Sequence, residues 1–100
     1  MPTDPTFRMT VQDVFSIKGR GTVVTGRIES GTIAVGNEIR IQGKSSSKTA
    51  VVSGVEMYRK VTSQAQAGDN VGLLLKDIGK EDVQPGDILT GAEMDFSWKP

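Results

Sequence analysis

Alternating hydrophobic and polar residues run through most of the chain and predict β-strands. The clearest case is residues 13–31, where two runs rich in Val, Ile, Phe and Thr flank a Gly-Arg-Gly turn. This pattern is typical of a β-hairpin, and Gly19 and Gly21 let the chain reverse because glycine adopts positive φ at little cost. In the returning strand, the even positions from 22 to 28 form the better core face, and the odd positions from 23 to 29 form the solvent face.

The strand before this turn is predicted over residues 7–17, and its hydrophobic pattern contains one irregularity. The residues expected on its core face are Met9, Val11, Phe15 and Ile17. Asp13 falls in the same phase and Val14 falls out of it, which indicates a β-bulge or a twist near Asp13, where the strand bends around a barrel corner. We interpret Phe7, Phe15 and Met57 as core residues.

A second recurring pattern is a glycine followed by Asn or Asp directly before an apolar run. It indicates a tight turn that leads into a strand, because glycine supplies the positive φ and the Asn or Asp side chain bonds the local backbone. The pattern occurs at residues 36–39, 68–71 and 85–88. The strands that it predicts span residues 38–42, 70–76 and 87–90.

A further strand is predicted over residues 49–60, with Val51, Val55 and Met57 on one face. Residues 61–67 are predicted as a loop and residues 80–83 as one helical turn. Six short strands at this spacing favour an all-β fold, a small closed six-stranded antiparallel β-barrel, because closure removes exposed strand edges. The predicted parts are a flexible lead-in, the barrel and a C-terminal tail with Trp98, over residues 1–6, 7–90 and 91–100.

Composition narrows the range of functions. The 100 residues fit one domain. Twelve basic and twelve acidic residues cancel, so any RNA contact must be local. Because the chain has no His and no Cys, it holds no Ser-His-Asp triad, no Cys nucleophile and no ordinary zinc site. We expect no cofactor and no metal. No apolar run approaches 18 residues and no signal-peptide pattern is present, so we expect a cytoplasmic protein without membrane contact.

Three stretches of the sequence resemble domain II of bacterial elongation factor Tu and of related translation GTPases. They are residues 13–31, 54–60 and 67–78, and the resemblance extends over about residues 7–89. It implies a six-stranded β-barrel that holds the aminoacyl-adenosine end of tRNA and touches the small ribosomal subunit. The family's G domain and third domain have no counterpart in this sequence, so the resemblance implies no GTP hydrolysis and no enzyme.

The resemblance also implies a binding pocket. The matching positions are Gln12, Asp13, Val23, Glu56, Tyr58, Arg59, Asn70 and Leu74. In the family, the terminal adenine lies against the positions of Val23, Glu56 and Leu74, while those of Arg59 and Asn70 help to hold the tRNA end and the amino acid. The position of Gln12 is commonly glutamate in the family, so this chain has lost a charge there.

The hydrophobic pattern bears on the same pocket, because Val23 and Leu74 are apolar side chains on an otherwise polar face. An apolar patch with a few directed polar groups suits a nucleic-acid base. The alternative is that the two residues are scattered exposed side chains, which are common on any protein. Arg20, in the turn, is either an RNA phosphate contact, an interdomain contact or a solvated residue.

Two functions remain open at this point. The first is a non-catalytic binding module that weakly binds the aminoacyl-tRNA 3′ end or ribosomal RNA. The second is a stand-alone protein-interaction barrel that docks a GTPase domain or another protein partner. Met1 and the tail after Leu89, which differs from the family's run into its third domain, favour a free-standing product over an excised domain.

Overall fold

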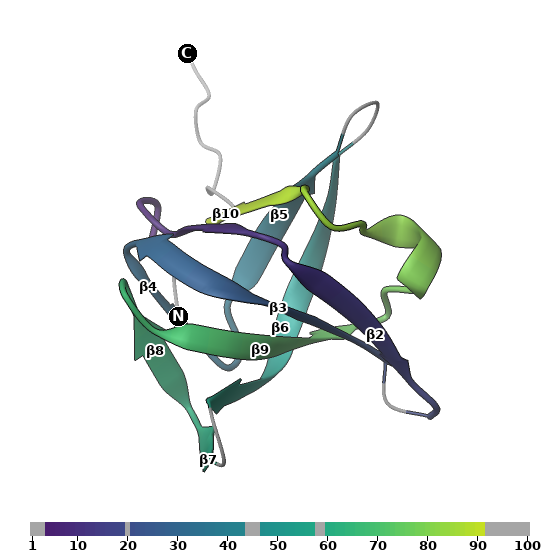
Figure 1. Cartoon of the computed structure of the whole chain (residues 1–100), viewed down its shortest axis with the longest axis horizontal. Helices are drawn as coiled ribbons and strands as arrows, with labels where there is room; N and C mark the ends of the chain where they lie inside the picture. The colour runs from purple at the N-terminus through teal and green to yellow at the C-terminus, as the bar shows by residue number, and fades with distance from the viewer. Residues whose placement is uncertain (1–3, 20, 44–46, 58–59, 92–100) are drawn as a thin grey trace.

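The computed structural model describes residues 4–19, 21–43, 47–57 and 60–91, and the regular secondary structure of this part of the chain is almost entirely β-strand (Figure 1). A single 3-10 turn, η1, spans Lys80–Asp82. The strands are β1 Arg8–Thr10, β2 Asp13–Ile17, β3 Gly21–Ser30, β4 Thr32–Ala34, β5 Glu38–Gln42, β6 Ser47–Met57, β7 Lys60–Thr62, β8 Gln64–Gln66, β9 Asn70–Lys76 and β10 Ile88–Gly91.

Six of these strands close into a barrel, which confirms the predicted fold. Their order around the ring is β1, β10, β5, β6, β9 and β3, and the pairing of β1 with β3 completes the circle. All of the pairings are antiparallel. β2 continues from β1 and pairs with the first half of β3, while β4 and β8 form a separate two-stranded sheet.

The hairpin of β2 and β3 forms as predicted. Asp13 pairs with Thr25 at one end and Ile17 with Gly21 at the other. Gly19 and Gly21 both have positive φ, at 77° and 119°. The even positions of β3 are buried and the odd positions are partly or fully exposed, so the alternation assigned the two faces of this strand correctly.

The bulge predicted near Asp13 is present, but its effect on the following residues was not predicted. The N–H of Gln12 donates to the carbonyl oxygen of Thr25 at 2.7 Å, and Asp13 pairs with the same residue. Two residues opposite one partner shift the side-chain phase by one position. Phe15 and Ile17 therefore point outward, 53% and 37% exposed, and the prediction that they belong to the core is wrong.

A second irregularity corrects the prediction for β6. Its pairing with β9 shifts between Val52 and Gly54, which leaves Ser53 as an extra residue. Val52 and Val55 are therefore buried while Val51 is exposed, so Val51 and Val55 do not share a face. β6 ends at Met57, and the predicted strand over residues 49–60 is replaced by β6 and the separate strand β7.

The predicted glycine turns all form and share one geometry. The glycines have φ of 95°, 96° and 96°, as a type II turn requires at its third residue. In each turn, the side-chain oxygen of the Asn or Asp accepts a hydrogen bond from the backbone N–H of the residue three positions earlier. The backbone N–H of the same Asn or Asp donates to the carbonyl oxygen of that earlier residue. The glycines are Gly36, Gly68 and Gly86, and the bonding side chains are Asn37, Asp69 and Asp87.

Residues 61–67 are not simply a loop. β7 pairs with β6 and β8 pairs with β4, and each has only three residues, too few to show a periodic pattern. The predicted helical turn is present as η1. In the predicted lead-in, Asp4 accepts hydrogen bonds from Thr6 and Thr32. Trp98 and the rest of residues 92–100 lie outside the described residues.

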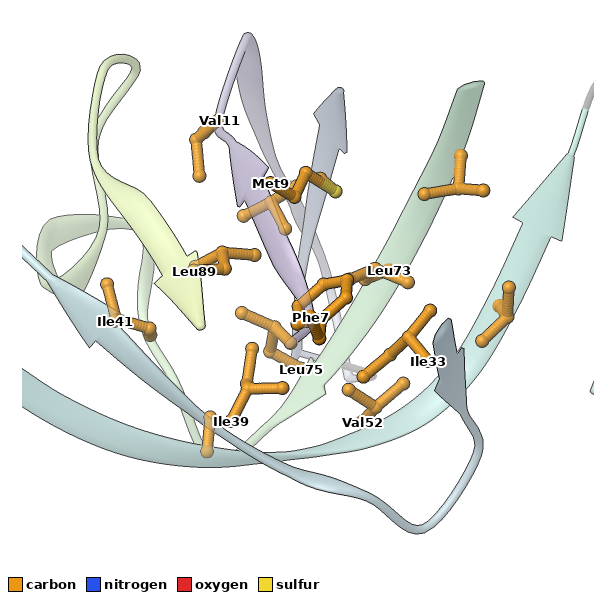
Figure 2. Close-up of a cluster of buried hydrophobic side chains, with 14 of the residues drawn as sticks. Phe7, Met9, Val11, Ile33, Ile39, Ile41, Val52, Leu73, Leu75 and Leu89 are labelled. Atoms are coloured by element: carbon orange, nitrogen blue, oxygen red, sulfur yellow. The ribbon is translucent and has the colours of Figure 1, made fainter. Parts of the chain in front are cut away.

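The core fills the ring, and the side chains labelled in Figure 2 point toward one another from β1 and the residues on either side of it, and from β4, β5, β6, β9 and β10. Phe7 is 1% exposed, which confirms its predicted place, and Met57 is partly buried against the core. Because side chains fill the interior of the barrel, a ligand would bind on its outer wall.

Candidate functional site

The outer wall over β2, β3, β9 and β6 is organised in two rows of paired residues. One row runs from Phe15 through Val23 and Leu74 to Gly54. The other row runs from Asp13 through Thr25 and Gly72 to Glu56. Side chains of directly paired residues on one face lie about 5 Å apart. The first row is therefore apolar throughout, and the second row is polar on both sides of a glycine.

A shallow open groove of about 340 Å³ lies on this wall. A Cβ atom at Gly72 would lie 3.4 Å from Val23 Cγ1 and 3.8 Å from Thr25 Cγ2. The missing side chain of Gly72 therefore leaves the hollow between Thr25 and Glu56 unfilled. The lining residues are Gln12, Val23, Thr25, Gly26, Glu56, Met57, Asn70, Val71 and Gly72.

The structure brings together four of the residues that the resemblance implied. Gln12, Val23, Glu56 and Asn70 line the groove, from the bulge, β3, β6 and the start of β9. Leu74 is the direct neighbour of Val23 in the apolar row, beside the groove and not in its lining.

The other implied residues do not add to the groove. Asp13 lies at the outer end of the polar row, opposite Thr25, and does not line the groove. Tyr58, Arg59 and Arg20 lie outside the described residues, so the structure gives no position for them.

Sequence reasoning missed Thr25, Gly72 and Phe15 as parts of this surface. A glycine inside a strand of Val and Leu is a signal for close approach of a ligand, so Gly72 could have been found. Phe15 could have been found by carrying the phase shift at the bulge through to the end of β2. With Phe15 included, the apolar row continues onto the exposed hairpin.

The wall next to the groove is held by ionic and hydroxyl contacts. Glu29 accepts hydrogen bonds from Thr10 Oγ1 at 2.6 Å and from Arg8 Nε at 2.9 Å. The Thr10 hydroxyl, followed by Arg8, lowers the pKa of the Glu29 carboxyl below its ordinary value. A second hollow of about 370 Å³, lined partly by Arg27 and Glu29, meets the groove at Gln12.

The side chains of the groove and of the apolar row are suited to binding a ligand. An apolar row beside a carboxylate and two amides accepts a flat ligand that carries hydrogen-bonding groups at its edge. Within the described ranges, no group of three or more carboxylates could hold a metal ion. The described part of the chain also contains no helix long and apolar enough to span a membrane.

In a comparison with protein families, the chain matches the family described as elongation factor Tu domain 2 over residues 21–90. The matched segment contains every strand from β3 to β10 up to Thr90. It therefore includes all of the groove except Gln12, which lies in the bulge before the match begins.

Proposed function

The chain belongs to the elongation factor Tu domain 2 family and is a translation-factor domain; on this premise we propose that its outer groove binds the 3′ end of aminoacyl-tRNA. The observation that carries the proposal is the adjacency of Val23, Leu74 and Glu56, which come from three strands of one wall. An apolar face next to a single carboxylate fits a terminal adenosine, with its flat base and its hydroxyl-bearing ribose.

In this arrangement the base lies against the apolar row and the ribose lies at the groove. Val23 and Leu74 contact the face of the adenine, because covering the flat base with apolar side chains removes apolar surface from water. The Glu56 carboxylate accepts a hydrogen bond from a ribose hydroxyl, and the 2′-hydroxyl is the group that distinguishes RNA from DNA. Glu56 is exposed, so it is accessible to the ligand.

The esterified amino acid lies at the end of the groove near Asn70 and Gln12. Both side chains are exposed amides, which donate and accept hydrogen bonds and carry no charge. The proposal keeps Asp13, Tyr58 and Arg59 as further contacts of the tRNA end, and Arg20 as a contact of an RNA phosphate. Ribosomal RNA is the second RNA partner that the family suggests, and a cytoplasmic location is part of the same proposal.

The binding is expected to be weak. The net charge is zero, so few counterions are released when RNA binds. A single barrel also lacks the avidity that several linked binding domains provide. We therefore expect an affinity set by the groove and only slightly dependent on salt.

The second candidate, a barrel that docks a GTPase domain or another protein, is favoured by one observation. Phe15 and Ile17 extend the apolar row and are 53% and 37% exposed. A contiguous exposed apolar patch is typical of a protein interface. In this case the same wall would contact a protein and the groove would be incidental.

The two candidates are separated by titration with an aminoacylated minihelix and with the same minihelix lacking its terminal adenosine. We expect tighter binding of the first, and weaker binding by Glu56→Ala and Leu74→Ala. Thr49→Ala, an exposed substitution on β6 outside the groove, is the matched control. Equal binding of both RNAs, or unchanged binding by both groove variants, contradicts the proposal. Retrieval of one protein partner without RNA supports the second candidate.

A further inference from the structure

The second hollow, of about 370 Å³, adjoins the groove on the same outer wall. The two share Gln12 in their linings. They also meet across two strands, because Arg27 of β3, in the lining of the second hollow, pairs directly with Asn70 of β9, in the lining of the groove. The second hollow is lined by Thr10, Val11, Gln12, Arg27 and Glu29.

The negative charge at this hollow is already compensated. The Glu29 carboxylate accepts one hydrogen bond from Thr10 Oγ1 at 2.6 Å and a second from Arg8 Nε at 2.9 Å. The second of these bonds is also an ion pair. Glu29 and Arg8 therefore cancel each other in charge, and the Thr10 hydroxyl donates to the same carboxylate.

The positive charge of Arg27 is not compensated in this way. Its side chain is exposed and makes neither an ion pair nor a hydrogen bond within the described residues. Asp69, the residue before Asn70, accepts the backbone N–H of Gln66 and does not line the hollow. The second hollow thus presents a guanidinium that is available to an anionic group of a ligand.

The outward residues of β3 follow the order of the parts of an aminoacyl-adenosine. Val23, Thr25 and Arg27 lie on the outward face of one strand, and consecutive members are about 6.5–7 Å apart, because a strand rises 3.2–3.4 Å per residue. In the proposed binding mode, the base lies at Val23 and the ribose lies between Thr25 and Glu56. A side chain esterified to that ribose, continuing in the same direction, reaches Arg27.

We propose, on the basis of the proposed function, that the second hollow receives the side chain of the esterified amino acid and favours a carboxylate there. The preferred ligands are then aspartyl- and glutamyl-tRNA. A guanidinium binds a carboxylate through two parallel charge-assisted hydrogen bonds, and the neighbouring Gln12 amide donates without adding a negative charge. The basic side chains of lysine and arginine esters are repelled by Arg27.

The test is fluorescence anisotropy with minihelices of one sequence that carry glutamate or glutamine, and aspartate or asparagine. Each pair of ligands differs only in a carboxylate against an amide. We expect the acidic member to bind about twofold to fivefold more tightly, as for an exposed ion pair. The difference should shrink at high salt, because ions screen exposed charges.

Arg27→Gln should abolish the difference between acidic and amide ligands. Arg40→Gln is the matched control, because Arg40 is exposed on β5, lies outside the groove and the second hollow, and its loss changes the net charge equally. This variant should keep the preference, and thermal unfolding verifies that both variants are folded.

The possible failures are distinguishable. Equal binding of the acidic and amide ligands, with both still requiring the terminal adenosine, overturns this inference and leaves the proposed function intact. Binding that does not depend on the terminal adenosine overturns both. A preference that survives Arg27→Gln, or that Arg40→Gln removes to the same extent, also overturns the inference.

Discussion

Filling the hollow at Gly72 is the most direct test of the groove. Gly72 has no positive φ, and a Cβ there would make ordinary contacts of 3.4 Å and 3.8 Å with Val23 and Thr25. Replacing such a glycine by alanine stabilises a protein by about 0.4–1 kcal/mol, and valine is well suited to a strand. Gly72→Val is therefore expected to fold with undiminished stability.

The same substitution should remove binding of the terminal adenosine. The valine methyl groups would occupy the hollow between Thr25 and Glu56, where the ligand lies in the proposed mode. Losing the hydrogen bond between the ribose and Glu56, which is worth about 1.5–3 kcal/mol for a bond to a charged group, raises the dissociation constant by about tenfold to 150-fold. Fluorescence anisotropy with a labelled aminoacyl-minihelix measures this change, and urea unfolding measures the stability of the same samples.

The reasoning is refuted by a Gly72→Val protein that is as stable as the unmodified chain and binds the minihelix equally well. Thr49→Val provides the comparison, because it also adds valine to an exposed strand position but lies away from the groove. A loss of binding in both variants would show that the effect does not belong to the groove.

Four further outcomes are expected. Gly26→Ala should lower the free energy of unfolding by about 1–3 kcal/mol in urea titrations, because its Cβ would lie 2.4 Å from a backbone carbonyl oxygen of β1. Phe15→Ser should change that energy by less than about 0.5 kcal/mol, whereas Phe7→Ala should cost about 3–5 kcal/mol. Asn37→Ala should cost about 1–3 kcal/mol, because a backbone N–H of β4 loses its acceptor. The pKa of Glu29 is lowered in the folded state. The ionised carboxylate therefore stabilises the fold above its ordinary pKa of about 4.3, and this effect is lost as the pH falls through the lowered folded-state pKa. Glu29→Gln should therefore weaken the dependence of the free energy of unfolding on pH in acid titrations.

The parts of the fold that the sequence predicted are those with local causes. The glycine turns form because a positive φ and a side-chain acceptor lie within four residues. The faces of β3 follow from ten residues of regular alternation. The faces of β2 and β6 were assigned wrongly in part, because one extra residue in each strand inverts the phase. Phe15, Ile17 and Val51 are the residues that changed face.

The sequence could predict which residues belong to the candidate site, but not how they lie relative to one another. Val23, Glu56 and Asn70 are far apart in the chain, and the barrel pairings bring them to one wall. The sequence gives no register between β9 and β6, since that register depends on the extra residue at Ser53. Gly72 was overlooked because it contributes to the site through its lack of a side chain. This lack forms a hollow only because the neighbouring strands place side chains beside it.

The bulge at Gln12 has a consequence for how this domain diversifies during evolution. The backbone N–H of Gln12 is held by the carbonyl oxygen of Thr25 whatever side chain it carries, and that side chain is exposed. In the proposed binding mode, exchanging amide, carboxylate or hydroxyl at this position would alter ligand preference without disturbing the interior of the barrel. Selection acting on recognition and selection acting on folding are thus uncoupled at a single residue.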